Sequence, residues 1–372
     1  MNNPSQALTS SIHPQASWSW VFSRLWKDTA ARWAIVILLA LYGAVALADA
    51  LAPVGPYWRD RSTANAPPTP IFLRDAEGHW HWPFVLKQTR VFHQESLEYL
   101  YPVDPSIRYP IQLGIEGEPY TLLGFIKSRW HLFGVKAPAQ IHLLGTDMNG
   151  RDVFSRLLFG GRISLTIGFL SLLVAFPIGL IYGGIAGFAG GRVDSWMMRL
   201  AEILMSIPSL YLLLTLATLI PASLSSTQRF GIVVISLALI GWAGLSRIIR
   251  GLVLSIKQQE FVEASQALGQ HPWIILTRHI LPQTWSFVVV AITLSVPSYL
   301  LMESGLSFLG LGIQQPDASW GNLLKEAQTL TNILYRPWML APGVLIFLAV
   351  LAFNILGDAV RDLLDPKSQV RA

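Results

Sequence analysis

Residues 162–187 read RISLTIGFLSLLVAFPIGLIYGGIAG, and the only charged side chain in this stretch is its first residue. A run of about 20 apolar residues is long enough to cross the hydrocarbon core of a bilayer as a helix. Because the bilayer core offers no water to bond the backbone N–H and C=O groups, a segment that crosses it must satisfy them internally. The stretch therefore predicts a transmembrane helix.

The composition of the whole chain points the same way. Of its 372 residues, 52% are hydrophobic and 13% are charged, whereas charged residues make up about a quarter of an ordinary globular sequence. The formal net charge of +5 comes from basic residues scattered between apolar segments, which argues against nucleic acid as a partner. The chain has no cysteine, so disulfides, thiolate metal sites and a cysteine nucleophile are excluded.

Further apolar stretches repeat the pattern, so the sequence predicts an all-α polytopic membrane protein. The six predicted transmembrane helices are residues 33–51, 162–187, 197–221, 230–248, 284–304 and 338–358. Pro177, Pro208 and Pro297 lie inside three of them, where each proline removes a helical hydrogen bond and bends the axis. Bent helices suit a gated pathway.

Basic residues between the spans predict the orientation. Arg24, Lys27 and Arg32 precede the first span, and most other basic flanks fall on the same side. The positive-inside rule makes that side cytoplasmic, and six spans place both termini there. Three arginines before the second span oppose this orientation, but they follow a long loop, where the rule is weak.

The N-terminal region is predicted to lie in the cytoplasm and at the membrane surface. Residues 1–16 are polar and contain proline, so we expect disorder there. Residues 17–33, SWSWVFSRLWKDTAARW, place most of their tryptophans on one helical stripe and basic residues on the other side. Such a segment is typical of an amphipathic helix at the membrane interface.

The region between the first two spans is too long for an ordinary connection and predicts a small extracytoplasmic insertion, either α/β or β-rich. Residues 69–86 and 111–125 read as extended pairs around the turns DAEG (75–78) and EGEP (116–119). His79 and His81 would share one face of a strand, but no third ligand stands out near them in the sequence. We therefore expect a structural or surface role for both histidines, and no metal site.

Two carboxylates lie within apolar spans. Glu202 falls early in the third span, and Glu303 falls at the outer end of the fifth, next to Ser304. A carboxylate in a bilayer is costly and usually faces a cavity or a partner, so these three residues are candidates for lining a pathway. A structural role is the alternative, and Arg199 is placed to pair with Glu202.

The segment between the fourth and fifth spans reads QQEFVEASQALGQHPWIILTRHILP over residues 258–282 and predicts two short helices. The first, residues 259–268, has a face of small side chains with larger apolar neighbours, which suits a groove on another protein. That face consists of Phe261, Ala264, Ser265 and Leu268. Gly269 follows as a helix stop, and Pro282 is expected to end the second helix.

This segment resembles the EAA loop of ATP-binding-cassette importer permeases, in which Glu-Ala-Ala is followed by a spaced Gly and by Leu-Pro. The matching positions here are Glu263, Ala264, Ser265, Gly269, Leu281 and Pro282. Ser265 replaces the second alanine of the pattern, a mild change on a face of small residues. His279 occupies the usual isoleucine position, and the form RHILP is associated with the dipeptide/oligopeptide branch.

Other stretches resemble the C-type permease of that binding-protein-dependent branch. They are LLGTDMNGRDVFSRLLFGGRISL (143–165), ESGLSFLGLGIQQPDASWGNLL (303–324) and LGDAVRDLLDP (356–366). The long first external loop is similar to that of microcin/oligopeptide permease relatives. The resemblance implies the type I importer permease fold, divided as follows: a cytoplasmic tail with an interfacial helix (1–32), a first transmembrane helix (33–52), an insertion (53–160), a permease core (161–358, with the EAA loop at about 248–283) and a cytoplasmic tail (359–372).

The resemblance further implies that the chain is half of a pathway in a bacterial plasma (inner) membrane. Its partners would be a homologous second permease, two cytoplasmic ATPases and an extracytoplasmic solute-binding protein that delivers di- or oligopeptides. Residues 259–268 would form the coupling helix, and Glu263, Ala264 and Gly269 would lie at the ATPase contact. ATP and Mg²⁺ would bind the partner ATPases, so no cofactor and no enzymatic activity are expected in this chain.

Two alternatives remain open. The same branch contains permeases for nickel and for glutathione-like solutes, and the quoted motifs report coupling rather than cargo. An ATP-independent secondary transporter is the other alternative, but such proteins often show internal repeats and intramembrane charge chains, which are not evident here. No lysine follows a glycine as in a P-loop, and G-x-S-x-G and H-E-x-x-H are absent.

Overall fold

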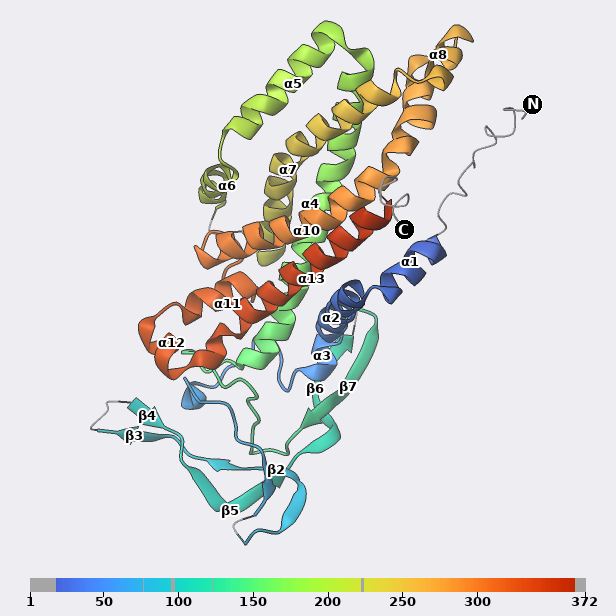
Figure 1. The fold of residues 1–372 in the computed structure, drawn as a ribbon. Coiled ribbons are helices and arrows are strands. Elements are labelled where there is room, and N and C mark those ends of the chain that lie inside the picture. Colours follow the sequence, from blue (N-terminus) through green and yellow to red (C-terminus); the bar gives the residue numbers. More distant parts are fainter. Residues whose placement is uncertain (1–17, 76, 95–97, 123, 222–223, 365–372) are drawn as a thin grey trace, which may run out of the picture.

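The computed structural model describes residues 18–364 except 76, 95–97, 123 and 222–223. The part of the chain that it describes forms a bundle of long helices with small β-sheets at one end, which we call the sheet end (Figure 1). The short helix α8 lies at the opposite end, the α8 end. The prediction of a polytopic helical protein is therefore confirmed, and the insertion is β-rich rather than α/β.

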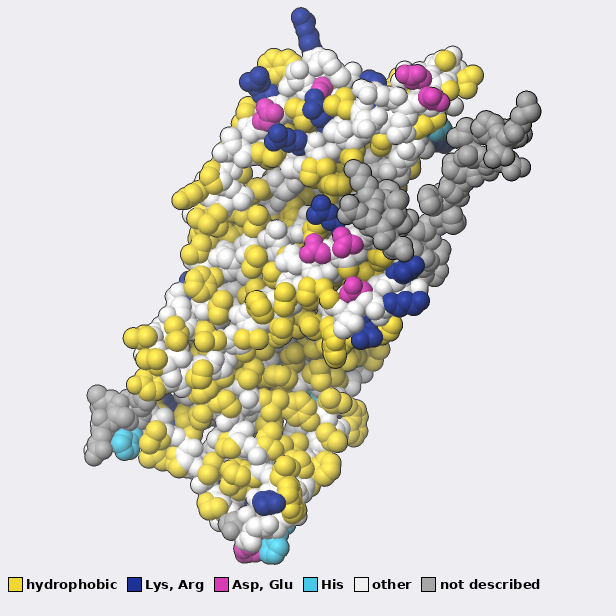
Figure 2. All heavy atoms as spheres, in the orientation of Figure 1, with side chains coloured by type: hydrophobic (Ala, Val, Ile, Leu, Met, Phe, Trp, Pro, Cys, Tyr) yellow, Lys and Arg dark blue, Asp and Glu magenta, His cyan; other side chains and the backbone are white. Residues whose placement is uncertain are grey.

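Five helical stretches among the described residues are long and apolar enough to cross a membrane: Thr29–Ala46, Val153–Ala189, Ser226–Ile256, Pro272–Phe308 and Pro337–Leu364. They contain α2 (Thr29–Ala46), α4 (Val153–Ala189), α7 (Ser226–Ile256), α10 (Trp285–Phe308) and α13 (Ala341–Leu364). Figure 2 shows hydrophobic side chains over most of the bundle surface, as expected for helices in contact with lipid.

A bent pair of helices stands where the third span was predicted and corrects that prediction. Residues 197–221 were expected to form one helix, but α5 (Gly191–Ser206) and α6 (Ser209–Thr218) meet at an angle of 79°. The residue before a proline is driven out of the helical region, and Ile207 is accordingly extended, with φ −86° and ψ 123°. Pro208 thus breaks the helix, whereas Pro177 and Pro297 lie inside continuous helices.

Helices α4 and α7 pack closely because glycines of α4 face the backbone of α7. A Cβ on Gly183 would lie 2.2 Å from the carbonyl oxygen of Ser246, and a Cβ on Gly187 would lie 2.8 Å from that of Arg250. Both distances are shorter than real Cβ contacts, so larger side chains would force the helices apart. The pair forms the centre of the bundle.

The described N-terminal helix, α1 (Trp18–Lys27), packs its buried Val21 and Leu25 against Val360 near the end of α13. Phe22 and Trp26 stack on each other on the exposed side, as expected for an interfacial helix. The predicted disordered start, residues 1–16, and most of the C-terminal tail lie outside the described residues.

The insertion contains three small antiparallel sheets. Strands β1 (Phe72–Arg74), β2 (Trp80–Gln88) and β5 (Val103–Pro110) form the first in the order β1-β2-β5, β3 (Val91–His93) pairs with β4 (Glu98–Leu100), and β6 (Gln112–Leu122) pairs with β7 (Ile126–Gly134). The DAEG turn joins β1 to β2, as predicted.

The predicted EGEP turn is wrong. Residues 116–119 lie inside β6, where the register with β7 is irregular, and the reversal occurs around Gly124, which has φ +84°. The glycine and proline of EGEP are common in turns. Pairing with β7 nevertheless keeps this stretch in strand β6, where it forms an irregularity in the register.

The remaining helices cap the sheet end of the bundle. They are α3 (Ala48–Leu51), α11 (Trp320–Ala327), α12 (Leu330–Tyr335) and a 3₁₀ turn at Pro337–Leu340. Figure 1 shows α11 and α12 between the long helices and the strands.

Candidate functional site

At the α8 end, the predicted first helix of the cytoplasmic segment is present as α8 (Glu260–Ala267). Its C-terminus has the expected geometry. Gly269 has φ +72°, the left-handed region in which glycine ends helices. The N–H of Gly269 donates to the carbonyl of Gln266 (2.9 Å), and the N–H of Gln270 donates to that of Ser265 (3.2 Å). The chain therefore turns sharply at Gly269.

One side of α8 is anchored and the other is bare. Val262 is fully buried, in a cluster with residues of α7 and of the segment after α8. Phe261, Glu263, Ala264 and Leu268 are exposed, and Leu268 keeps 81% of its surface accessible. The face that the sequence singles out is therefore uncovered by the described chain. The anchor Val262 was not predicted from the sequence; its signal is that it is the only β-branched residue of the segment 259–268.

The second predicted helix does not end at Pro282. Residues Pro272–Ile274 (α9) run into a π-helical turn at Ile275–Ile280, a 3₁₀ turn at Leu281–Thr284 and then α10. Pro282 lies in the first positions of the 3₁₀ turn, where its missing N–H is tolerated. Leu281 points at α4, since a Cβ on Gly184 would lie 3.2 Å from its Cδ2. Continuous helical turns therefore link α9 to α10.

Two further contacts hold the helices that flank α8. Arg250 of α7 donates through Nη2 to Asp194 of α5 (2.5 Å), and through Nε to the same carboxylate (2.9 Å). Lys257 donates to the carbonyl of Phe188 at the end of α4 (2.5 Å). Sequence reasoning did not identify these contacts, because the partners are far apart in the chain.

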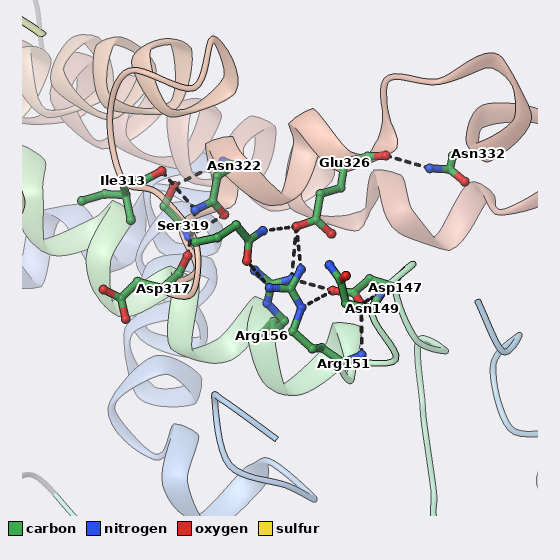
Figure 3. A network of polar contacts seen from close by, with 11 residues as sticks. Asp147, Asn149, Arg151, Arg156, Ile313, Asp317, Ser319, Asn322, Glu326 and Asn332 are labelled. Carbon is green, nitrogen blue, oxygen red and sulfur yellow. Dashed lines mark hydrogen bonds and ion pairs between the residues drawn. The ribbon is translucent and has the colours of Figure 1, made fainter. Parts of the chain in front are cut away.

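At the sheet end, a network of buried charges joins the stretch at residues 143–165 to α11 (Figure 3). Asp147 accepts from Nε of Arg151 (2.6 Å) and from Nη1 of Arg156 (2.6 Å). Both arginines also reach Glu326 of α11, at 3.1 and 3.2 Å. Arg156 and Asp147 are each 1% exposed. The network thus connects the start of α4 to α11 by charge pairs that solvent does not screen.

Trp320 at the start of α11 packs against α4. Its indole N–H donates to the carbonyl of Leu157 (2.9 Å), and its backbone N–H donates to Oγ of Ser164 (3.0 Å). A Cβ on Gly161 would lie 3.0 Å from the indole ring, so the glycine makes room for the tryptophan. The fully buried indole therefore fixes α11 on α4.

Glu303 is enclosed by these same helices. Its carboxylate accepts from the hydroxyls of Ser164 (2.9 Å), Ser304 (3.4 Å) and Ser307 (2.7 Å), and its side chain is fully buried. The hydroxyls of Ser164 and Ser307 each also accept a backbone N–H, which leaves their protons for the carboxylate. In this conformation Glu303 and Ser304 are packed between helices and not exposed to a cavity, so their assignment to a pathway stays a prediction.

We expect Glu303→Gln to lower the free energy of unfolding by roughly 1–3 kcal/mol. The reason is that an amide N–H₂ group, which only donates, replaces a carboxylate oxygen that accepts from a buried hydroxyl. Glu202→Gln is the matched control, since Glu202 is exposed on α5. Thermal unfolding of the two detergent-solubilised variants measures the difference. Equal midpoints for Glu303→Gln and the unaltered chain, combined with lost transport, would instead support a pathway role for Glu303.

A cavity of about 1370 Å³ lies beside the charge network at the sheet end. Its lining includes Arg59, Lys325 and Arg336. At its rim, the hydroxyl of Tyr57 donates to Asp317 (2.6 Å), and this hydrogen bond raises the pKa of Tyr57 to about 12. Its lining also includes Arg151 and Glu326, so cationic side chains outnumber acidic ones there.

The structure brings acidic groups to the two histidines of the insertion, which the sequence analysis did not expect. Asp75 and Glu77 approach His79, and Nε2 of His81 lies 2.8 Å from Asp75. The hydrogen bond from His81 is the main reason why the pKa of Asp75 is held well below its usual range. Arg108 also lies 3.3 Å from this carboxylate, and a cation beside it opposes a metal ion. We therefore interpret this cluster as a turn that is stabilised by contacts to Asp75, and not as a metal site.

Comparisons with known proteins agree with this architecture. Residues 175–370 match the family described as binding-protein-dependent transport system inner membrane component. The matching region runs from the middle of α4 past the end of α13, includes α8 and covers more than half of the chain. The chain belongs to this family. As a membrane component of a transport system, the permease is not an enzyme.

Individual relatives cover the same core of the permease. The dipeptide transport system permease protein DppC of Bacillus subtilis is 44% identical over 232 residues, 62% of this chain and 70% of that protein. The oligopeptide transport system permease protein OppC of Bacillus subtilis is 41% identical over 233 residues, 62% of this chain and 74% of that protein. The glutathione transport system permease protein GsiD of Pectobacterium atrosepticum is 38% identical over 233 residues, 62% of this chain and 75% of that protein.

Proposed function

We propose that this permease is one subunit of an ATP-driven importer that carries di- and oligopeptides across a bacterial inner membrane. The observation that carries the proposal is α8, a short helix that is anchored by Val262 and leaves Phe261, Ala264 and Leu268 bare beside a glycine turn. A bare face of this kind fits a groove on a partner. We assign that partner as an ATPase, with ATP and Mg²⁺ bound there and not in this chain.

The proposed orientation places the α8 end in the cytoplasm together with both termini. Basic residues gather at that end, as the positive-inside rule requires; they are Arg192, Arg199, Arg247, Arg250, Lys257 and Arg278. Figure 2 shows Lys and Arg side chains at the α8 end, above a broad hydrophobic surface. The sheets then face outside, where a solute-binding protein delivers the cargo and the insertion helps to dock it.

In this scheme α8 transmits the ATPase movement to the pathway. The turn at Gly269 joins α8 to α9, and from α9 the chain continues through the π-helical and 3₁₀ turns into α10 without a further loop, so displacement of α8 is passed on to α10. A homologous second permease supplies the other half of the pathway. Closure of two ATPases would then alternate the pathway between inward-facing and outward-facing states.

Peptide cargo is proposed from the relatives, since DppC and OppC are named for dipeptide and oligopeptide transport. GsiD, named for glutathione transport, makes a glutathione-like solute the second candidate. The test is ATP hydrolysis by the assembled complex in nanodiscs with its binding protein. We expect di- or oligopeptides to stimulate hydrolysis. Stimulation by glutathione alone or by nickel alone would reject peptide cargo. An equal rate of hydrolysis with and without the permease would reject the importer.

A further inference from the structure

The β6–β7 hairpin has an apolar closed end that nothing in the described chain covers. Residues 119–126, PYTLLGFI, carry no charge. At the reversal, Phe125 keeps 73% of its surface exposed and Ile126 keeps 48%. A contiguous apolar surface on a soluble domain usually marks a contact with a protein or a membrane.

The hairpin is held against the end of the first membrane helix. Nδ1 of His131 lies 2.9 Å from the carbonyl oxygen of Ala52, directly after α3, and Nε2 lies 3.2 Å from that of Glu118 within the hairpin. His131 is buried, and the ring of Phe133 packs near Phe154 at the start of α4. The middle of the hairpin is therefore fixed where α2 and α3 leave the membrane.

The closed end lies beyond that contact, on the side of the membrane helices. The open end adjoins the outer sheet, where Ile111 donates its N–H to the carbonyl of Pro83 (2.9 Å). Starting there, the hairpin passes Ala52 and continues for five more residues, from His131 to Ile126, or roughly 16 Å at about 3.3 Å per residue. Figure 1 shows the hairpin curving from the sheets towards α3 and α2.

The charges on the hairpin are ordered along this direction. Exposed Lys127 pairs with Thr121 next to the apolar end, and exposed Arg129 follows opposite the irregular stretch that contains Glu118. Exposed Trp130 comes next towards the open end, paired with Glu116. Apolar side chains at the tip, followed by basic residues and tryptophan, match the order of acyl chains, phosphates and water at a membrane surface. Leu39 of α2 and its C-cap residue Leu47 are also exposed apolar side chains.

We propose that the closed end of this hairpin is inserted in the membrane leaflet beside α2 and α3, with Leu122, Phe125 and Ile126 among the lipid chains. Lys127 and Arg129 then contact lipid phosphates. The hairpin holds the insertion at a set height above the bilayer. This proposal requires only that the chain spans a membrane, so it stands or falls independently of the peptide cargo and of the ATPase contact.

The test uses the absence of cysteine from the chain. Phe125→Cys and Ile126→Cys each receive an environment-sensitive fluorophore in the assembled complex, with any partner cysteines removed, in nanodiscs. Glu77→Cys is the control, because its side chain is 75% exposed in the turn between β1 and β2. We expect blue-shifted emission at positions 125 and 126, quenching by lipids brominated on the acyl chain and protection from aqueous iodide. The control should show the reverse.

Three outcomes would overturn the proposal. Equal iodide quenching at positions 125, 126 and 77 would place the closed end in water. Protection from both iodide and brominated lipid would show that a protein partner covers it. Lipid quenching that disappears when the solute-binding protein is added would mean that the tip is a docking surface. Since two labelling positions are used, failure of one variant to assemble leaves the other to decide.

Discussion

Replacing Gly269 with isoleucine should reduce ATP-driven uptake about tenfold or more while the chain still reaches the membrane. Gly269 has φ +72°, and a non-glycine residue pays roughly 1–2 kcal/mol in this region, with a β-branched residue at the costly end. The substituted turn would leave α8 misplaced for its partner. Uptake into proteoliposomes containing the assembled complex measures the effect, and the amount of membrane-inserted chain serves as the reference.

Gly269→Asn separates conformation from contact, because asparagine adopts the left-handed region more easily than other non-glycine residues. A Cβ at this position meets nothing within 4 Å inside the chain, so the substitution adds no internal clash. We expect Gly269→Asn to keep substantially more uptake than Gly269→Ile. If both variants transport normally, α8 is not the coupling element. If both fail equally, the cause is a partner surface pressed on Gly269 and not the backbone turn.

The second large effect is expected at Arg156. Arg156→Ala should lower the free energy of unfolding by about 3–5 kcal/mol, because removing one member of a buried ion pair leaves uncompensated charge. Asp147, which Arg156 contacts at 2.6 Å, would retain Arg151, but its second cation would be lost. Thermal or denaturant unfolding of the purified chain in detergent measures the change.

The matched control is Arg192→Ala, since Arg192 is exposed at the start of α5. It removes the same side chain without burying a charge, and we expect a change within about 0.5 kcal/mol, as for most surface substitutions. A further variant, Arg156→Lys, keeps the charge but loses the planar fork that reaches both Asp147 and Glu326, and should fall between the two. Equal stability of all three variants would show that the charge network does not hold α4 to α11.

Local signals were sufficient for several elements. Charge-free runs predicted the long helices because a segment that crosses lipid must bond its own backbone, whatever its neighbours are. The position of α8 followed from its spacing and from Gly269, whose left-handed φ is a property of the chain within a few residues. The DAEG turn is equally local: the carboxylate of Asp75 accepts from the N–H groups of Glu77 and His79.

Local signals misled where packing or pairing competes with them. Pro282 was expected to end a helix, yet the π-helical and 3₁₀ turns around it carry the chain into α10. EGEP was expected to form a turn, yet β7 pairs along it. Pro208 was expected to bend a helix, and its actual effect is a break of 79° between α5 and α6. Proline removes a backbone N–H donor and glycine permits more backbone conformations. Whether the chain then turns, bends or breaks depends on the helices and strands that pack against it.

The sequence by itself determined that this permease crosses a membrane, where five of its six predicted spans lie and which short helix precedes Gly269. Only the tertiary structure decided that Arg156 and Glu326 share a buried charge network, that serines of α4 and α10 enclose Glu303, and that the β6–β7 hairpin ends beside the membrane helices. The physical reason is distance along the chain. Arg156 and Glu326 are 170 positions apart, and such partners meet only through helix packing, which no local pattern of residues encodes.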